Sequence, residues 1–319
     1  MGKYLLRRLV IGIPVLLLIT LLDFVFINLA PGDPVQAMIN PDRTPPGSVA
    51  YEEQLKALGL DQPLPIRYVR WLGEMISGNL GYSYMTHRPV TQIIGERLWN
   101  TFKLAGTSLL FAWIVAVPIG ILAAVKQYSW FDYAQGALSF LWISIPAFFI
   151  GLLAIYLFSL KLGWLPVGGV ATIGETPTLG DHLRHLLLPT LVLGLGNAAW
   201  LTRYARNSML EVLSQEYLVT ARAKGLKDRV ILWRHALPNA VLPLITLGGL
   251  QFPELFGGAV IVETIFSWPG LGRLGVEAAF KRDYTVMMGL LLMVAVLVFV
   301  GNLLADIGYA IADPRIRYE

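Results

Sequence analysis

Six long apolar stretches restrict the fold of this 319-residue chain more than any other feature of its sequence. A bilayer core about 30 Å thick is crossed by roughly 20 apolar residues of helix, and a helix satisfies its own backbone hydrogen bonds there. The sequence therefore predicts an all-α membrane protein with six transmembrane helices. The stretches cover residues 9–30, 101–125, about 134–160, about 185–205, about 239–265 and 285–311.

The composition agrees with a membrane location and excludes several kinds of site. Hydrophobic residues make up 55% of the chain and charged residues only 14%, whereas soluble domains carry about 25% charged residues. The absence of cysteine excludes disulfides and thiolate sites. The cationic start MGKYLLRR leads into an apolar run too long for a signal peptide. We therefore expect residues 9–30 to be retained as the first span.

The distribution of positive charge predicts which side of the membrane each end occupies. Residues 1–8 carry three cations, which places them in the cytoplasm by the positive-inside rule. Six spans would return the C-terminus, with Arg315 and Arg317, to the same side. The loop after the fourth span agrees, because residues 203–235 hold seven basic and three acidic side chains. Pro243 and Pro253 are expected to break the fifth span.

The segment between the first two spans, residues 31–100, is predicted to be extracytoplasmic. It carries seven acidic and six basic residues, which excludes a nucleic-acid-binding patch. Two amphipathic helices are expected in it, over 51–60 and 64–78, and the segment should lie on the membrane or against a partner. The second helix would place on one side the apolar residues Ile66, Val69, Trp71, Leu72, Met75 and Ile76.

Motifs for nucleotide or catalytic chemistry are missing from the sequence. There is no G-x-x-x-x-G-K-[ST] phosphate loop and no H-E-x-x-H zinc motif, nor a G-x-S-x-G nucleophile turn. His182 and His185 lie three residues apart at the outer end of the fourth span. They are either surface polar residues at a helix start or two ligands of a metal site without a third. We expect no enzyme and no metal site.

The cytoplasmic stretch 216–239, EYLVTARAKGLKDRVILWRHALPN, is unusually rich in cations for this chain. Gly225 suits the left-handed position that ends a helix, and a second short helix is predicted from about Asp228. The helix before Gly225 is expected to be about 15 residues long. Its apolar face would hold Leu210, Leu213, Tyr217 and Ala221.

Small and basic side chains occur together where the first helix of this stretch turns. Ala221, Ala223 and Gly225 leave little bulk there, so another protein could approach closely. The surrounding cations are Arg222, Lys224, Lys227 and Arg229. This arrangement suits a helix that docks into a groove of a cytoplasmic partner. It suits equally a cationic helix on anionic headgroups, and the residues alone leave both interpretations open.

The same stretch resembles the coupling loop of binding-protein-dependent ABC importer permeases, which is written E-A-A-x3-G-x9-I-x-L-P. Ala221, Gly225 and the pair Leu237-Pro238 stand at the family spacing. Three positions depart from the pattern, because Val219 and Thr220 replace Glu-Ala and His235 replaces Ile. The form TARAKGL at 220–226 is similar to the dipeptide, oligopeptide and nickel branch.

The resemblance extends along nearly the whole chain. It includes LAPGDPV at 29–35, LGLDQPLPIRYVRWL at 58–72, VETIFSWPGLGRL at 262–274 and DIGYAIADPRIR at 306–317. The PGDP turn and the long outer segment favour the first, B-type, of two related permeases. Residues 101–319 would then form the core of the permease, with a cytoplasmic coupling loop at 206–238.

The resemblance implies a transmembrane subunit of an ATP-driven importer of dipeptides or oligopeptides in a prokaryotic inner membrane. Nickel or oligosaccharide uptake is the alternative within transport, and a non-transporting scaffold or receptor is the alternative outside it. The implied partners are a second homologous permease, two ATP-binding subunits, an extracytoplasmic solute-binding protein and membrane lipid. ATP and magnesium would be used by the partner subunits, with no cofactor on this chain. The implied ATPase contacts are Glu216, Tyr217, Ala221, Arg222, Ala223, Lys224, Gly225, Leu226, Leu237 and Pro238.

Charged residues inside spans are costly and are candidates for the solute pathway. Asp23 in the first span and Glu254 in the fifth are the candidates that we favour. Glu263, near the outer end of the fifth span, either lines the pathway or fixes an outer gate. Asp306 in the sixth span is expected to pair with Arg315 or to cap backbone groups.

Overall fold

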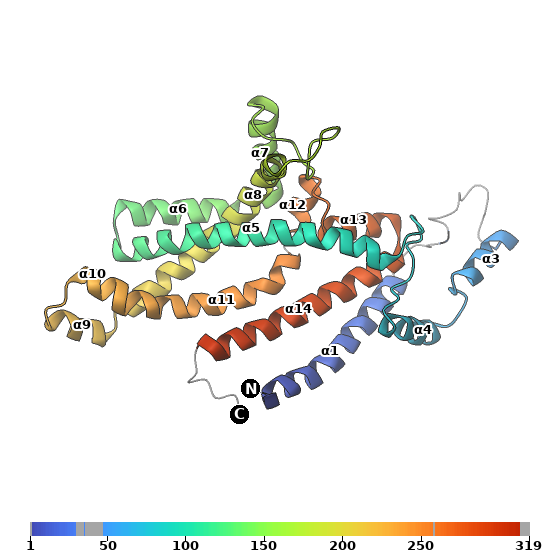
Figure 1. Cartoon of the computed structure of the whole chain (residues 1–319), viewed down its shortest axis with the longest axis horizontal. Coiled ribbons are helices and arrows are strands. Elements are labelled where there is room, and N and C mark those ends of the chain that lie inside the picture. Colours follow the sequence, from blue (N-terminus) through green and yellow to red (C-terminus); the bar gives the residue numbers. More distant parts are fainter. Residues whose placement is uncertain (1, 30–34, 36–46, 258, 313–319) are drawn as a thin grey trace. The chain divides into compact units, whose positions relative to one another are not determined.

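The computed structural model describes residues 2–29, 35, 47–257 and 259–312. Within these residues the regular structure is helical, with one isolated bridge between Tyr82 and Pro89 (Figure 1). The helices of the first half are α1 (Gly2–Leu29), α3 (Val49–Ala57), α4 (Leu64–Ile76), α5 (Val90–Val125), α6 (Trp130–Ser144), α7 (Ala147–Ala154) and the π-helix η1 (Ile155–Lys161). Those of the second half are α8 (Leu179–Leu213), α9 (Glu216–Ala223), α10 (Asp228–Val230), the π-helix η2 (Ile231–Ala236), α11 (Leu237–Gly257), α12 (Val260–Ile265), α13 (Leu271–Lys281) and α14 (Tyr284–Ala312).

Four helices in the described part of the chain are long and apolar enough to cross a membrane, and a bent pair raises this number to five. They correspond to the first, second, fourth and sixth predicted spans. Their limits are Val10–Leu29, Val90–Val125, Leu179–Leu213 and Tyr284–Leu303. The sixth span therefore coincides with α14, whereas α5 begins earlier than expected, at Val90 instead of residue 101.

The third predicted span is bent by 98° between α6 and the helix that runs over Ala147–Lys161. Ile145, which precedes Pro146, has extended backbone angles of φ −91° and ψ 128°. The ring of a proline disfavours helical angles in the preceding residue, and Pro146 then serves as the N-cap of α7. The continuous helix expected over 134–160 is thus replaced by two segments.

The fifth predicted span differs from expectation in the opposite sense. Helix α11 runs without interruption through Pro243 and Pro253 to Gly257, so the predicted breaks at these prolines are wrong. Membrane helices tolerate proline because neighbouring groups satisfy the freed backbone carbonyl. The helical path instead changes between α11 and α12, which starts at Val260.

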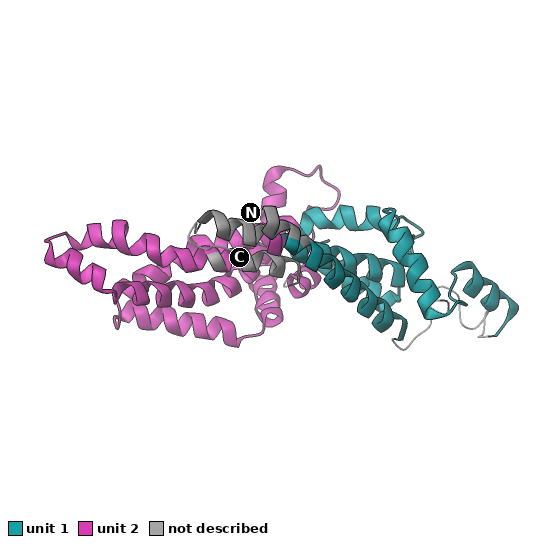
Figure 2. Ribbon diagram, turned by 90° about the horizontal axis from the view of Figure 1, so that it is seen from below, with its two compact units in different colours: residues 1–101, 269–300, 318–319 teal, residues 102–268, 301–317 magenta. Residues whose placement is uncertain are grey.

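The chain divides into two compact units (Figure 2). Unit 1 consists of residues 1–101, 269–300 and 318–319, and unit 2 of residues 102–268 and 301–317. This grouping differs from the single core expected over 101–319, because α13 and the first part of α14 belong with the N-terminal residues.

Unit 1 is organised around the start of α5. Val90 and Ile94 are fully buried against Leu271 of α13 and Val286 of α14. The carboxylate of Asp283, between α13 and α14, accepts hydrogen bonds from the Ser83 hydroxyl at 2.5 Å and the Tyr84 amide at 3.2 Å. These contacts fix the loop before α5 on the turn between α13 and α14.

Helices α3 and α4 confirm the two helices predicted in the segment between the first spans. Gly59 and Gly78 follow them with φ of 65° and 83°, angles that glycine adopts without steric cost. The apolar residues of α4 do not share one environment as expected. Trp71 packs on α1, whereas Ile66, Val69 and Ile76 are exposed.

Unit 2 is organised around α8, which packs against α6, α7 and α11. Close approach to α5 depends on Gly120, because a Cβ there would lie 2.6 Å from the Thr202 carbonyl oxygen. An ion pair joins α6 to α8: Arg206 donates from Nε and Nη2 to the Asp132 carboxylate at 2.6 and 2.8 Å. Asp132 is only 5% exposed, so the bidentate pair is largely shielded from water.

Candidate functional site

The connection between α8 and α11, residues 214–236, begins with a break that the sequence did not predict. Helix α8 ends at Leu213, and Gln215 has extended backbone angles of φ −75° and ψ 141° before α9 starts. The Ser214 hydroxyl donates to the Glu211 carbonyl at 2.7 Å, and such local bonds compete with helix continuation. The single helix of about 15 residues expected before Gly225 is therefore wrong.

The end of α9 agrees with the prediction for Gly225. Its φ is +78°, and the amide of Leu226 donates to the Ala221 carbonyl at 3.3 Å. This is the pattern of a helix that ends on a left-handed residue. A Cβ at Gly225 would meet no atom within 4 Å, so backbone conformation and not crowding favours glycine here.

The inner face of α9 is held by a small apolar core in unit 2. Leu218 is fully buried and Ala221 nearly so, together with Met209 of α8 and Ile231 and Ala236 of η2. Ala221 therefore contributes its small volume to packing within the chain, and not to a surface that a partner approaches. The core makes α9 a firmly attached helix instead of a loose loop.

Tyr217 lies outside this apolar core, contrary to the prediction from helical spacing. Its side chain is 43% exposed. The hydroxyl accepts a hydrogen bond from Asn239 Nδ2 at 3.0 Å and donates to the His235 carbonyl at 3.4 Å. Tyr217 thus ties α9 to the first turn of α11, which Leu237 and Pro238 open. Asn239 was not anticipated, because no local pattern marks it.

The outer face of α9 and the turn after it are exposed. Val219 and Leu226 are 59% and 40% exposed, and Ala223 and Gly225 lie between them without bulk. Arg222 forms an ion pair with Asp228 at 3.4 Å, but both side chains are solvated, so the pair adds little stability. The other predicted contact residues that are exposed are Glu216, Arg222, Lys224 and Pro238, whereas Leu237 is half-buried.

Two contacts connect the site to the helices behind it. The Ser208 hydroxyl of α8 donates to the Ala240 carbonyl of α11 at 2.8 Å, and Arg206 of α8 holds Asp132 of α6. Figure 1 shows α9 and α10 at the tip where α8 ends and α11 begins. These contacts join the end of α8, which precedes α9, to both α11 and α6.

The sequence matches known protein families over almost all of its length. Residues 116–318 match the family described as binding-protein-dependent transport system inner membrane component. The chain belongs to this family. Residues 1–105 match the corresponding N-terminal region of such membrane components. The resemblance seen in the 216–239 stretch is thereby confirmed, and the protein is a multi-pass component of an inner membrane.

Relatives of this transport component cover its full length. It is 46% identical over 319 residues to the oligopeptide transport system permease protein AppB of Bacillus subtilis, with 100% of each chain covered. It is 44% identical to a putative peptide permease protein of Brucella suis, with 99% of each chain covered. It is 39% identical to the glutathione transport system permease protein GsiC of Salmonella paratyphi A, again over 100% of both chains.

Solved structures support the same fold. A chain of the MetNI methionine ABC transporter, in an inward-facing conformation, superposes with a TM-score of 0.56 at 19% identity. The match covers 70% of this chain and 97% of the other. At this identity the likeness establishes a shared fold and nothing about the solute.

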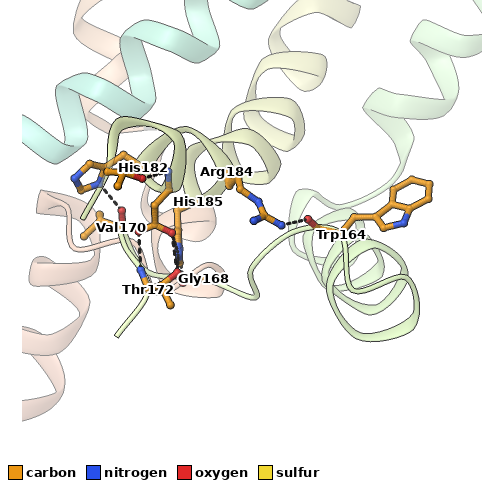
Figure 3. A network of polar contacts seen from close by, with 9 residues as sticks. Trp164, Gly168, Val170, Thr172, His182, Arg184 and His185 are labelled. Carbon is orange, nitrogen blue, oxygen red and sulfur yellow. Dashed lines mark hydrogen bonds and ion pairs between the residues drawn. The ribbon is translucent and has the colours of Figure 1, made fainter. Parts of the chain in front are cut away.

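His182 and His185 of this transport component hold a loop in place (Figure 3). His185 is 5% exposed, with Nδ1 2.9 Å from the Gly168 carbonyl and Nε2 3.4 Å from Asp181. His182 Nδ1 lies 2.6 Å from the Val170 carbonyl. The view of His185 as a surface polar residue is therefore wrong. Among the residues described, no group of three potential metal ligands comes together.

The loop that these histidines hold also contacts α12. The Gly169 amide donates to the Phe266 carbonyl at 2.8 Å, and a Cβ on Gly168 would lie 2.2 Å from that oxygen. Glu263, three residues earlier in α12, is fully buried. The loop and the C-terminal end of α12 therefore form one packed layer in unit 2.

The remaining charged candidates lie on three different helices. Asp23 is half-buried in α1 of unit 1, and none of the described residues forms a hydrogen bond or ion pair with its carboxylate. Glu254 lies in α11 and Asp306 in α14, but their side chains fall outside the described part of the structure. The predicted pairing of Asp306 with Arg315 also falls outside it.

Proposed function

We propose that this chain is the transmembrane permease subunit of an ATP-driven importer of peptides. The names of full-length relatives at 39–46% identity, two of them peptide permeases and one a glutathione permease, carry this proposal. The proposed topology has six spans with both termini in the cytoplasm, which requires α11 with α12 and the bent α6–α7 pair to count as one span each.

The connection between α8 and α11 is the proposed docking site for a separate ATPase. Its outer face offers exposed small and apolar residues at Val219, Ala223, Gly225 and Leu226, bordered by cations. Its inner face is packed on η2 and the end of α8. A helix that is anchored on one side and bare on the other can transmit a pull, which fits a subunit that changes between two conformations.

The proposed partners supply the functions that this chain does not perform itself. Two ATP-binding subunits supply hydrolysis with ATP and magnesium, and this chain binds no cofactor. A second homologous permease completes the pathway, and an extracytoplasmic binding protein delivers the solute. Glu263 is proposed to fix the outer gate, because its complete burial suits a positioning role better than solute contact. Asp23 stays the proposed pathway residue of α1.

The docking site is tested by placing a bulky side chain on its exposed face in the assembled transporter. We expect Ala223→Trp to leave assembly intact but to abolish peptide uptake and its coupling to ATP hydrolysis. Ala50→Trp is the matched control, because Ala50 is an exposed alanine in the outer segment, and it should transport normally. Normal uptake and coupling by Ala223→Trp would overturn the assignment.

A further inference from the structure

A cavity of about 520 Å³ lies within unit 1, between α3, α4 and the loop before α5. Pockets for small ligands and cofactors fall in this size range. Its walls also include Phe24, near the end of the span in α1, and Thr285 in the first turn of α14. Because two membrane helices terminate at its level, the cavity lies at the depth of the membrane interface.

Among the described residues that line this cavity are three cations and one acid, Glu74. Lys56 and Arg70 are exposed and Arg67 is half-buried. In the described part of the chain no carboxylate lies within ion-pair distance of any of them. Arg67 donates instead to Asn28 Oδ1 and lies over the Phe24 ring. Burial lowers the pKa of its guanidinium, so an anion beside it would relieve an unfavourable environment.

Helix α4 presents three different sides at this place. One side packs on α1, where the Phe24 and Tyr68 ring centroids lie 5.4 Å apart and Tyr68 Oη lies 3.1 Å from Thr20 Oγ1. A second side carries Arg67 and Arg70 toward the cavity. The third is apolar and bare, with Val69 67% and Ile76 74% exposed. Helices with an apolar stripe beside cations lie in the plane of a membrane interface.

We infer that α4 lies in the interface at the C-terminal end of α1 and that the cavity beside it binds the phosphate headgroup of an anionic phospholipid. Arg67, Arg70 and Lys56 would contact the phosphate, while Val69 and Ile76 enter the acyl region. The apolar stripe favours a lipid over a free anion, because a free anion would contact only the cations and would not require an apolar stripe beside them. This site goes beyond the proposed transport function and does not depend on which solute is carried.

The lipid preference is tested on the assembled transporter in nanodiscs of equal parts phosphatidylglycerol and phosphatidylcholine. Native mass spectrometry after extraction into detergent should find phosphatidylglycerol enriched on the permease. Arg70→Gln should lower this enrichment about five-fold, as expected for one basic side chain near an anionic surface. Arg70→Lys should retain most of it. Lys281→Gln removes one exposed charge outside the cavity and should have no effect.

Two outcomes would overturn the assignment. Equal enrichment in Arg70→Gln and Lys281→Gln would show that the cavity does not select the lipid. Displacement of the bound lipid by an excess of inorganic phosphate would indicate a site for free anions instead.

A second measurement tests the position of α4. The chain has no cysteine, so Val69→Cys provides a single site in this subunit for a spin label. The label should be more accessible to oxygen than to a water-soluble nickel chelate. A label at Glu53→Cys, on exposed α3, should show the reverse. A water-accessible label at position 69 would contradict the interfacial placement.

Discussion

At the scale of single residues, the structure separates what local pattern predicts from what it does not. Gly225 was predictable, because a left-handed helix end has a local signature. The pair of Asp132 and Arg206 was not, since 74 residues separate its members. The sequence showed Arg206 only as one of several cations. The position of Tyr217 outside the apolar core was not predictable either, because it depends on a break at Gln215 that apolar spacing does not reveal.

Removing the charge of Asp132 should be costly. Asp132→Asn leaves the Arg206 guanidinium without its counter-charge at a largely buried site, which typically costs about 3–5 kcal/mol. We expect a value near the lower end, because Arg206 is 22% exposed. Unfolding of the purified subunit in mixed micelles measures this change, with Asp132→Glu as the charge-retaining control. A loss no greater than that of the control would contradict the structural role of the pair.

The stability of variants at Gly225 should depend only on how readily the new residue adopts a positive φ. Gly225→Val should cost about 1–2 kcal/mol, because a β-branched residue is strained at positive φ. Gly225→Asn should cost less, because asparagine visits this region more readily. The order of the two variants in thermal unfolding checks the prediction. Equal stability would mean that the turn after α9 does not have the left-handed conformation.

At the scale of elements, apolar runs predicted the helices well, but the positions of prolines did not predict where helices break. Pro118 and Pro189 lie inside the continuous helices α5 and α8, yet Pro146 separates α6 from α7. The local restriction by proline is the same in each case. The difference lies in packing, because α7 turns away to contact α8 and α12. Such long-range contacts cannot be read from one apolar stretch.

The loop between η1 and α8 should be sensitive to volume at Gly168. Gly168→Ala would place a Cβ against the Phe266 carbonyl, and overpacking of this kind costs about 1–3 kcal/mol. The variant should loosen the loop from α12, which hydrogen–deuterium exchange at residues 162–178 would detect. Gly180→Ala is the control, because its Cβ would meet only Thr178 Oγ1 at 3.9 Å. Unchanged exchange in Gly168→Ala would contradict the packing of this layer.

At the scale of the whole molecule, the chain combines two units with different tasks. Unit 2 holds the connection between α8 and α11, with an inner face fixed by Leu218 and an outer face left bare. Unit 1 holds the cavity beside α4. The sequence predicted the helical membrane class and the helix end at Gly225. It did not predict that residues 269–300 join the N-terminal unit, because that grouping arises from contacts distant in sequence.

The proposed function depends on contact between a separate ATPase and the exposed face of α9. Because this chain lacks cysteine, Ala223→Cys can carry a thiol-linked photo-crosslinker as the only label on this subunit, which is labelled before the transporter is assembled. We expect light to produce a crosslinked species that contains this chain and an ATP-binding subunit, and none from Ala50→Cys. Crosslinks from position 223 to lipid alone, or the same ATPase product from both positions, would contradict the account.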